Sequence, residues 1–124
     1  MDEEKVSRNE EQDAAAYADH LIVQLKKGLL SYLVILTCSR KIYTSEILKK
    51  LRAAGLEVEE GTIYPLLARI QRDGLLTHTW QESSQGPPRK YYKTTPYGRE
   101  VAEALAKNLE ALNKTINVLE RSKK

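Results

Sequence analysis

The sequence predicts a mainly α-helical fold that contains one small β-hairpin and ends in a long helix. Three observations predict it. Apolar residues recur at helical spacing in three segments between residues 14 and 72. Alternating, β-prone residues then flank a turn at residues 83–88. From residue 96 onward, apolar residues step alternately by three and four positions as far as residue 119, which is the spacing of a helical seam.

The composition is typical of one soluble domain. At 124 residues the chain can bury a modest core but is too short for two ordinary domains. No apolar run approaches the roughly 20 residues that span a bilayer, and the acidic N-terminus has no signal-peptide layout. We therefore predict a cytoplasmic protein with no membrane partner. The single cysteine, Cys38, excludes an intrachain disulfide and is expected to be a buried small hydrophobe.

Charge is unevenly distributed along the chain. Residues 1–13 hold six acidic and two basic side chains, a net charge of −4, whereas the whole chain carries +3. The remaining residues therefore carry +7. A basic body of this size favours a polyanionic partner and a salt-dependent attraction to phosphates.

The N-terminal region divides into a tail and a helix. Residues 1–13 are charged and lack an apolar pattern, which predicts a disordered tail or a frayed extension. From Ala14 a helix is expected, because apolar residues form a stripe at i+4 spacing. The stripe comprises Leu21, Leu25, Leu29 and Leu33.

A second helix is predicted for residues 44–54, because Gly55 can supply a left-handed end. Either Thr44 or Ser45 can cap its start. Its inward side chains are expected to be Ile47, Leu48 and Leu51, and its outward ones Lys49, Lys50 and Arg52.

A third helix precedes Gly74, which suits a left-handed helix end. Pro65 leaves its start open. A helix that begins at Thr62 holds the proline in its first turn, where amide donors are unpaired in any case, whereas an earlier start requires a kink. The apolar face comprises Ile63, Leu66, Leu67 and Ile70.

A β-ribbon, or wing, follows the third helix. Its strands are predicted at residues 75–82 and 89–95, around the turn at 83–88. Tyr91 and Tyr92 must point to opposite sides of the second strand, so one of them is expected in the core. Trp80 is expected to be a core or interface anchor. Three helices and a wing within residues 14–95 make a winged helix-turn-helix domain.

The last predicted helix begins at Pro96, with Thr95 as its cap, and runs to about residue 119. Its heptad seam is longer than so small a body can cover, so residues 96–124 are predicted to form a dimerisation helix with a second copy of the chain. The predicted dimer contacts, from this helix and the first one, are Leu21, Leu25, Leu105, Leu109, Leu112, Ile116 and Leu119.

The third helix carries basic side chains, and the second strand of the ribbon that follows begins with two more. This arrangement is typical of domains that bind double-stranded DNA. The candidate DNA-binding residues are Lys49, Thr62, Tyr64, Arg69, Arg72, Arg89 and Lys90. All but Arg72 have a structural alternative: Thr62 can be a helix cap, and Arg89 and Lys90 can protect an edge strand from aggregation. Tyr64, Arg69 and Lys49 can simply be solvated surface.

Motifs of catalysis are missing from the sequence. It has no nucleophile elbow, phosphate-binding glycine loop or paired-carboxylate constellation. The two histidines, His20 and His78, have no cysteine or carboxylate neighbours at metal-ligand spacing. We therefore predict that the chain is not an enzyme and that it needs no metal or other cofactor.

Five ordered blocks resemble the PadR family of bacterial transcriptional regulators, over roughly residues 21 to 120. The blocks are Gly28-Leu29-Leu30, Tyr43-Thr44-Ser45-Glu46-Ile47-Leu48, Gly61-Thr62-Ile63-Tyr64-Pro65-Leu66-Leu67 with Gly74-Leu75-Leu76, Gly86-Pro87-Pro88-Arg89-Lys90-Tyr91-Tyr92, and Thr95-Pro96-Tyr97-Gly98-Arg99. A single C-terminal helix is similar to the shorter branch of that family.

The resemblance implies a homodimeric repressor that binds an inverted-repeat operator and is released by a small apolar or aromatic effector. Some members of the short branch bind flat aromatic drugs in a pore at the dimer interface through a Trp on the last helix, and the matching position here is Leu109. Two alternatives stay open: a MarR-like regulator, against which the block at residues 61–65 argues, and a winged-helix protein-interaction adaptor that does not bind DNA.

Overall fold

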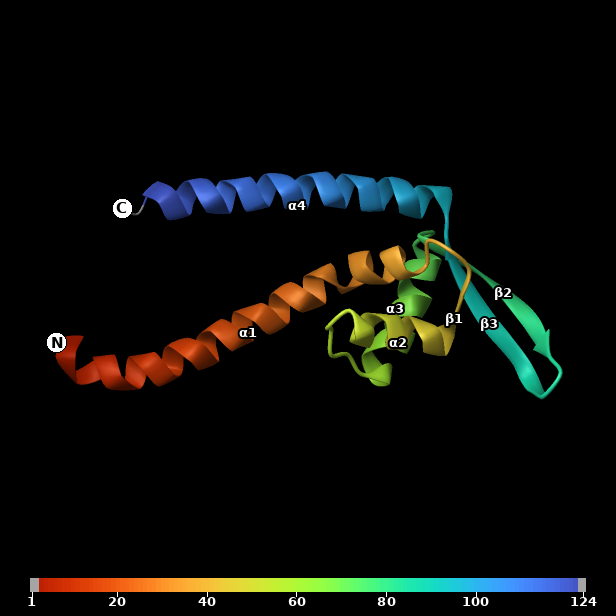
Figure 1. Ribbon diagram of the computed structural model, residues 1–124, viewed down its shortest axis with the longest axis horizontal. Coiled ribbons are helices and arrows are strands. Elements are labelled where there is room, and N and C mark those ends of the chain that lie inside the picture. Colours follow the sequence, from red (N-terminus) through yellow and green to blue (C-terminus); the bar gives the residue numbers. More distant parts are fainter. Residues whose placement is uncertain (1–2, 123–124) are drawn as a thin grey trace. The chain divides into compact units, whose positions relative to one another are not determined.

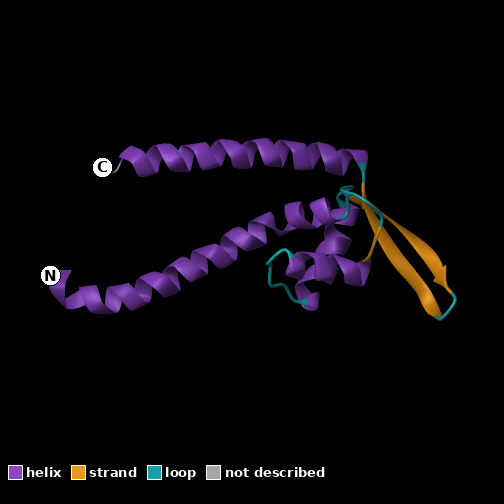
Figure 2. Ribbon diagram, in the orientation of Figure 1, coloured by secondary structure: helices purple, strands orange, loops and turns teal. Residues whose placement is uncertain are grey.

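The computed structural model describes the backbone of residues 3–122 and the side chains of residues 13–122. The chain forms two compact units, divided between residues 30 and 31. The elements are α1 (Glu3–Thr37), β1 (Ile42–Tyr43), α2 (Thr44–Ala53), α3 (Glu60–Arg72), β2 (Leu76–Ser83), β3 (Gly86–Thr94) and α4 (Pro96–Ser122) (Figures 1 and 2). Four helices and one small antiparallel sheet confirm the predicted fold class among the residues described.

The first unit is the N-terminal part of α1. The helix begins at Glu3, so the backbone of residues 3–13 is helical where a disordered tail or a frayed extension was predicted. Residues 1–2 of that segment lie outside the described residues. The physical reason is composition: Glu, Lys, Arg, Gln and Ala have high helix propensities even where no apolar stripe is present. The side chains of Leu21 and Leu25 are exposed.

One segment of α1, Asp13–Thr37, is long and apolar enough to cross a bilayer by length and composition alone. Core helices of soluble proteins can satisfy the same criteria. The segment also contains Asp19, Lys26 and Lys27, whose charges are costly within a bilayer. The absence of a membrane partner therefore stays a prediction.

The second unit has a core built from the end of α1, from α2 and α3, and from the sheet. Every inward residue predicted for the second and third helices is buried, as is Cys38. Burial raises the pKa of the Cys38 thiol from 9.0 to about 11, although its hydrogen bond with the Thr37 side chain and the charge of Lys50 act in the opposite direction. The core comprises Val34, Ile35, Cys38, Ile42, Ile47, Leu48, Leu51, Ile63, Leu66, Leu67, Ile70, Leu76 and Tyr92.

The sheet has the strand order β1-β3-β2, with antiparallel pairing throughout. Strand β1 was not predicted from the sequence, because two residues are too few to leave an alternating pattern. The turn is also tighter than predicted, since β3 begins at Gly86 and includes Pro87 and Pro88. A register irregularity between Gln81 and Ser83 lies opposite these prolines, and such irregular positions tolerate residues without an amide donor.

Glycines end both short helices, as predicted. Gly55 has a φ of 103°, and the amide of Leu56 donates to the carbonyl of Leu51 at 2.9 Å. Gly74 has a φ of 84°, and Leu75 donates to Ile70 at 2.9 Å. Both pairs are six-to-one hydrogen bonds of Schellman type, which satisfy carbonyls that the helix leaves unpaired.

Helix α3 begins at Glu60, so Pro65 lies in its second turn. The earlier of the two starts allowed by the sequence is therefore the one adopted, and Thr62 is inside the helix instead of capping it. Because proline has no amide hydrogen, the carbonyl four residues before it, in Gly61, lacks its usual helical donor.

Helix α4 begins as predicted. The amide of Gly98 donates to the hydroxyl of Thr95 at 2.9 Å, which is a side-chain cap at the first turn. That hydroxyl in turn donates to the carbonyl of Gly74 at 2.6 Å. Thr95 thus ties the end of α3 to the start of α4, and α4 leaves the base of the hairpin from a fixed point (Figure 1).

Candidate nucleic-acid interface

Four of the predicted DNA-binding residues lie on α3 and are exposed to solvent. They are Thr62, Tyr64, Arg69 and Arg72. The opposite side of the same helix supplies four buried residues to the core, so α3 is fixed in place while its polar side is free. Thr62 makes no capping bond, because Glu59 occupies the cap position and no side chain there bonds the helix. The structural alternative for Thr62 is therefore wrong.

The two arginines of α3 lie in its last turn, whereas Glu60 lies in its first turn. Cations at a helix C-terminus and anions at its N-terminus both interact favourably with the helix dipole. The last turn of α3, which carries the two arginines, is also the end that leads through Gly74 into the wing. The basic residues of α3 and those of the wing are thus carried by elements that follow one another directly along the chain.

Lys49 lies on α2 and is exposed, as predicted for the outward side of that helix. Its neighbour on that side, Arg52, is engaged locally: its guanidinium donates to the carbonyl of Val58 at 2.9 and 3.2 Å. Among the described side chains, no hydrogen bond or ion pair links Lys49 to the α3 residues. Its membership of the site stays a prediction.

The strand register separates Arg89 from Lys90. Residue pairs across the hairpin are Gln81 with Arg89 and Trp80 with Lys90, so the two cations point to opposite faces of the sheet. Arg89 lies over the ring of Tyr43, 5.0 Å from its centroid. Lys90 lies over Trp80 and Tyr92 instead, at 5.7 and 5.1 Å.

We call the two sides of the ribbon the Tyr43 face, which carries Tyr43, Arg89 and Tyr91, and the Trp80 face, which carries His78, Trp80, Lys90 and Tyr92. On the Tyr43 face the two tyrosine rings lie 5.6 Å apart, and Lys41 lies over Tyr91 at 5.3 Å. Cation–π contacts of this kind hold the basic side chains in defined places.

The Trp80 face is joined to α3. The side-chain amide of Gln71 lies 2.6 Å from Nδ1 of His78, at hydrogen-bonding distance. Tyr92 on this face is buried, which confirms that one of the paired tyrosines belongs to the core. Trp80 is 62% exposed, so of its two predicted roles the core position is wrong, and the interface position stays a prediction. The reason is that the strands run on beyond the core, where a side chain on the inner face meets solvent.

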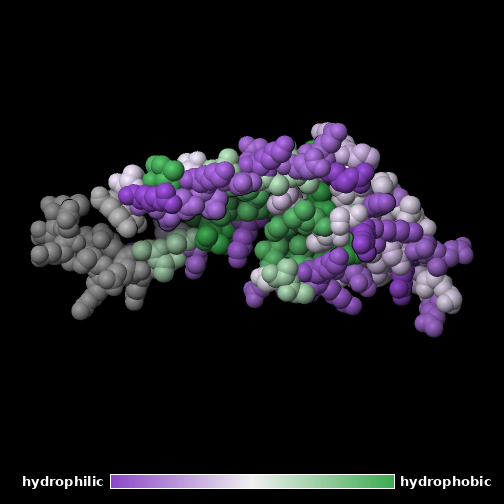
Figure 3. All heavy atoms as spheres, turned by 45° about the horizontal axis from the view of Figure 1, so that its top comes forward, coloured by the Kyte–Doolittle hydropathy of each residue, from purple (hydrophilic) through white to green (hydrophobic). Residues whose placement is uncertain are grey.

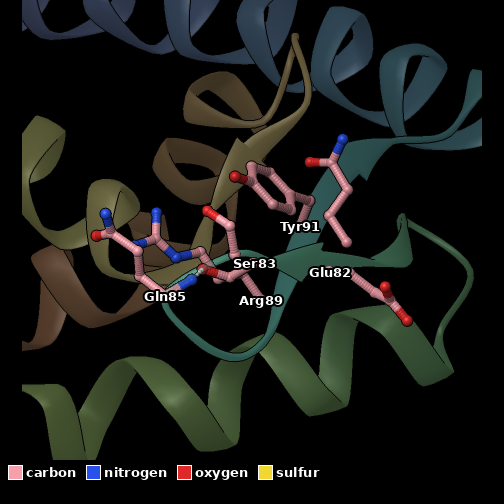
Figure 4. A pocket seen from close by; sticks show the side chains of 7 residues that line it. Glu82, Ser83, Gln85, Arg89 and Tyr91 are labelled. Atoms are coloured by element: carbon pink, nitrogen blue, oxygen red, sulfur yellow. Dashed lines mark hydrogen bonds between the residues drawn. The ribbon is translucent and has the colours of Figure 1, made fainter.

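The wing turn encloses an open hollow of about 390 Å³. Figure 4 shows Ser83, Gln85, Arg89 and Tyr91 gathered around it, whereas Glu82 points away from them. The amide of Gln85 donates to the Ser83 hydroxyl at 3.4 Å, which shapes the turn. Figure 3 shows mainly hydrophilic side chains over the wing, at the right-hand end of the view. Hydroxyls and a guanidinium around an open hollow suit an anionic group such as a phosphate.

The sequence analysis missed Gln71 and His78 as parts of this surface. Their only signal was positional, since Gln71 flanks the apolar face of α3 and His78 alternates with Trp80 along β2. Contact between them depends on how helix and strand pack, which the spacing of residues does not specify.

Comparison with known proteins identifies the family. Residues 33–104 match the model of the Transcriptional regulator PadR-like family. The transcriptional regulator Rv3488 of Mycobacterium tuberculosis is 32% identical over 76 residues, which is 61% of this chain and 70% of that protein. A PadR-like transcription factor from Bacteroides fragilis is 44% identical, with a TM-score of 0.71 over 81% of this chain and 98% of its own. A PadR family transcriptional regulator from Eggerthella lenta is 28% identical, with a TM-score of 0.79 over 87% and 96% of the two chains. The chain therefore belongs to the PadR-like family of transcriptional regulators, and it is a regulator and not an enzyme, as its motifs predict.

Proposed function

We propose that this regulator binds an inverted-repeat operator as a homodimer, acts as a repressor, and is released by a small apolar or aromatic effector. One observation carries the DNA-binding part: the exposed side of α3 presents Tyr64, Arg69 and Arg72 while its other side is locked into the core. A rigid helix with a polar, cationic outer side is what insertion into a major groove requires.

The wing supplies the second contact. At 13 residues, α3 is about 20 Å long, which fits one major groove. The hairpin begins at the cationic end of this helix and carries Arg89 and Lys90 on its two faces. A ribbon in this place reaches the phosphates or the minor groove beside the site that α3 reads.

The homodimer rests on the exposed apolar residues of α4. This helix has 27 residues and is about 40 Å long. Along its seam, Leu105 and Leu109 are half-buried, whereas Leu112, Ile116 and Leu119 are between 45% and 63% exposed. Three regularly spaced apolar side chains left in water favour a second helix as partner, and Leu21 and Leu25 are the residues of α1 proposed to meet it.

The effector proposal has support from an apolar hollow of about 180 Å³ beside the start of α4. It is lined by Ile35, Leu36 and Ala102, together with Ser39, Thr94, Arg99 and Glu103. Ala102 lies two helical turns from Leu109 on the same seam. A small apolar ligand between α4 and its neighbours can therefore change the angle at which the two α3 helices are presented.

The DNA-binding proposal is tested with fluorescein-labelled duplexes tiled across the region upstream of the gene, by anisotropy at several salt concentrations. Arg69→Ala should weaken binding to the preferred duplex by about 1–3 kcal/mol and relax preference at one base, if the guanidinium contacts a guanine. Arg89→Ala should weaken all duplexes alike and reduce the salt slope by about one. Arg121→Ala, an exposed arginine at the far end of α4, is the matched control. Wild-type protein that prefers no inverted repeat would favour the adaptor alternative.

The dimer proposal is tested by sedimentation equilibrium. Leu112→Asp places a charge in the seam and should give monomers, because an unpaired buried charge is costly. Asn113→Asp introduces the same charge one residue away, off the seam, and should leave the dimer intact. A Leu112→Asp protein that dimerises with unchanged affinity would remove the seam from the interface.

The effector proposal is tested by thermal-shift screening with planar aromatic compounds. Compounds that bind at the seam should raise the melting temperature of the wild type but not of Leu109→Arg. Compounds that stabilise both proteins equally would place the ligand elsewhere.

A further inference from the structure

Trp80 is the only tryptophan of the chain, and its side chain is 62% exposed near the middle of β2. Large aromatic side chains lose favourable free energy when they stay in water, and exposed ones often mark binding surfaces. Trp80 lies on the face of the wing that is joined to α3, but none of the roles proposed for DNA binding or dimerisation uses its indole ring.

The indole is held in place by its neighbours. Lys90, its cross-strand partner, lies over the ring at 5.7 Å from the centroid. His78 meets it edge-on, with ring centroids 6.4 Å apart and an interplanar angle of 86°. An aromatic ring fixed in this way loses little side-chain entropy when it binds a partner.

The surface around Trp80 adjoins one side of the recognition helix. His78, two residues before it on the same face, contacts Gln71 of α3. Gln71 shares a side of that helix with Ala68 and Tyr64, three and seven residues earlier, and both of these are exposed. Trp80 and Tyr64 therefore lie on surfaces that meet at the Gln71–His78 contact.

We propose that Trp80 packs against the sugar–phosphate backbone of the DNA beside the groove that α3 reads, with Lys90 pairing to the adjacent phosphate. This inference deepens the proposed function and rests on it. A nucleic-acid partner is favoured because Lys90 covers the Trp80 ring and the chain as a whole carries an excess of basic residues. The flat indole then supplies apolar contact with a deoxyribose, and the ammonium supplies charge. Glu82 is the acidic exception on the same strand, so Glu82→Gln should strengthen binding.

A single tryptophan makes the test direct, because all tryptophan emission reports on Trp80. Acrylamide quenching is measured for the full-length protein alone and with a mixed-sequence duplex at low salt, where phosphate contacts dominate binding. We expect efficient quenching of the free protein and protection when DNA is added. The same titration with heparin, a polyanion without stacked nucleotides, distinguishes general charge attraction from packing on a duplex.

Variants then measure the contribution to affinity. Trp80→Ala should bind the duplex about tenfold more weakly, as expected for loss of about 50–60 Å² of apolar contact. Its dependence on salt should be unchanged, because no charge is lost, whereas Lys90→Ala should reduce the salt slope by about one. Trp80→Phe should recover part of the affinity. Thr77→Ala changes an exposed side chain on the opposite face of the same strand, outside the hollow at the wing turn, and is the control. Thermal melts check that each variant folds.

The outcomes separate this inference from the proposed function. Wild-type protein that binds no duplex refutes both. The Trp80 contact alone is refuted if the protein binds the duplex normally, acrylamide quenches Trp80 in the complex as efficiently as in the free protein, and Trp80→Ala binds with unchanged affinity. Protection that grows with protein concentration in the absence of DNA assigns Trp80 to an interface between protein copies and overturns the inference.

Discussion

Gly98 occupies a position where a side chain cannot fit without movement. It lies in the first turn of α4 and is buried against the segment that links α3 to β2. A Cβ atom placed on it would lie 2.7 Å from Cγ2 of Thr94 and 3.2 Å from the carbonyl carbon of Leu75, and closer still to the Leu75 oxygen. Carbon atoms in ordinary contact are separated by about 3.5–4.0 Å. Gly98→Ala must therefore displace α4 or the Leu75 backbone.

The Leu75 backbone is poorly able to move. Its amide donates to Ile70 at 2.9 Å, and its carbonyl accepts from Thr95 at 3.0 Å. Overpacking of this kind costs about 1–3 kcal/mol, and weakening one backbone hydrogen bond adds about 1 kcal/mol. The higher helix propensity of alanine returns at most about 1 kcal/mol. We expect a net loss of about 1–3 kcal/mol from the free energy of unfolding, which lowers the melting temperature by roughly 3–12 °C.

Thermal melts at one fixed protein concentration measure this loss, because the melting temperature of an oligomer depends on concentration. Gly61→Ala is the matched control: Gly61 also lies in the first turn of a helix, but a Cβ there meets nothing within 4 Å. It should be neutral or slightly stabilising. If Gly98→Ala melts at the same temperature as Gly61→Ala, the close approach of α4 to Leu75 does not constrain residue 98, and the reasoning fails.

Two further predictions concern stability. Thr95→Ala removes the cap of α4 and the bond to Gly74, and should cost about 1–2 kcal/mol in chemical denaturation, whereas Thr95→Ser, which retains the hydroxyl, should keep most of it. Because the pKa of Cys38 is raised to about 11 in the folded protein, the folded state keeps its thiol proton where the unfolded chain loses it. The contribution of Cys38 to stability should therefore be constant below about pH 9 and fall between about pH 9 and 11. Over that range the free energy of unfolding should drop by roughly 2–3 kcal/mol more than in Cys38→Ala, which serves as the reference for all other titrating groups. Equal alkaline losses in both proteins would contradict it.

Local patterns in the sequence were enough to predict the helices of the second unit. Apolar spacing assigned the inward residues of α2 and α3, and Gly55 and Gly74 marked their ends, because both signals act within a few residues. Thr95 as the cap of α4 follows the same logic. The start of α1 was missed because the apolar pattern stops before the helix does, while the charged residues that continue it have high helix propensity.

Features that depend on distant residues could not be predicted. Strand β1 consists of Ile42 and Tyr43, and it exists only because Tyr92 and Tyr91, about 50 residues later, pair with it. Likewise, the contact of Gln71 with His78 depends on the packing of α3 against β2. Neither residue carries a local mark of its partner, so the local patterns along the chain do not predict these contacts.

The consequence for function is clearest at Arg89 and Lys90. The sequence analysis treated them as an equivalent basic pair, because two adjacent basic residues after a turn do not show which face of the wing each occupies. In the folded wing they differ by strand alternation: Arg89 lies over Tyr43, whereas Lys90 lies over Trp80 on the face joined to α3. A duplex that meets only one face of the wing engages one of the two cations more closely. The loss of salt dependence on replacing Arg89 and on replacing Lys90 therefore tells which faces of the wing meet the DNA, and a Trp80 contact requires a loss at Lys90.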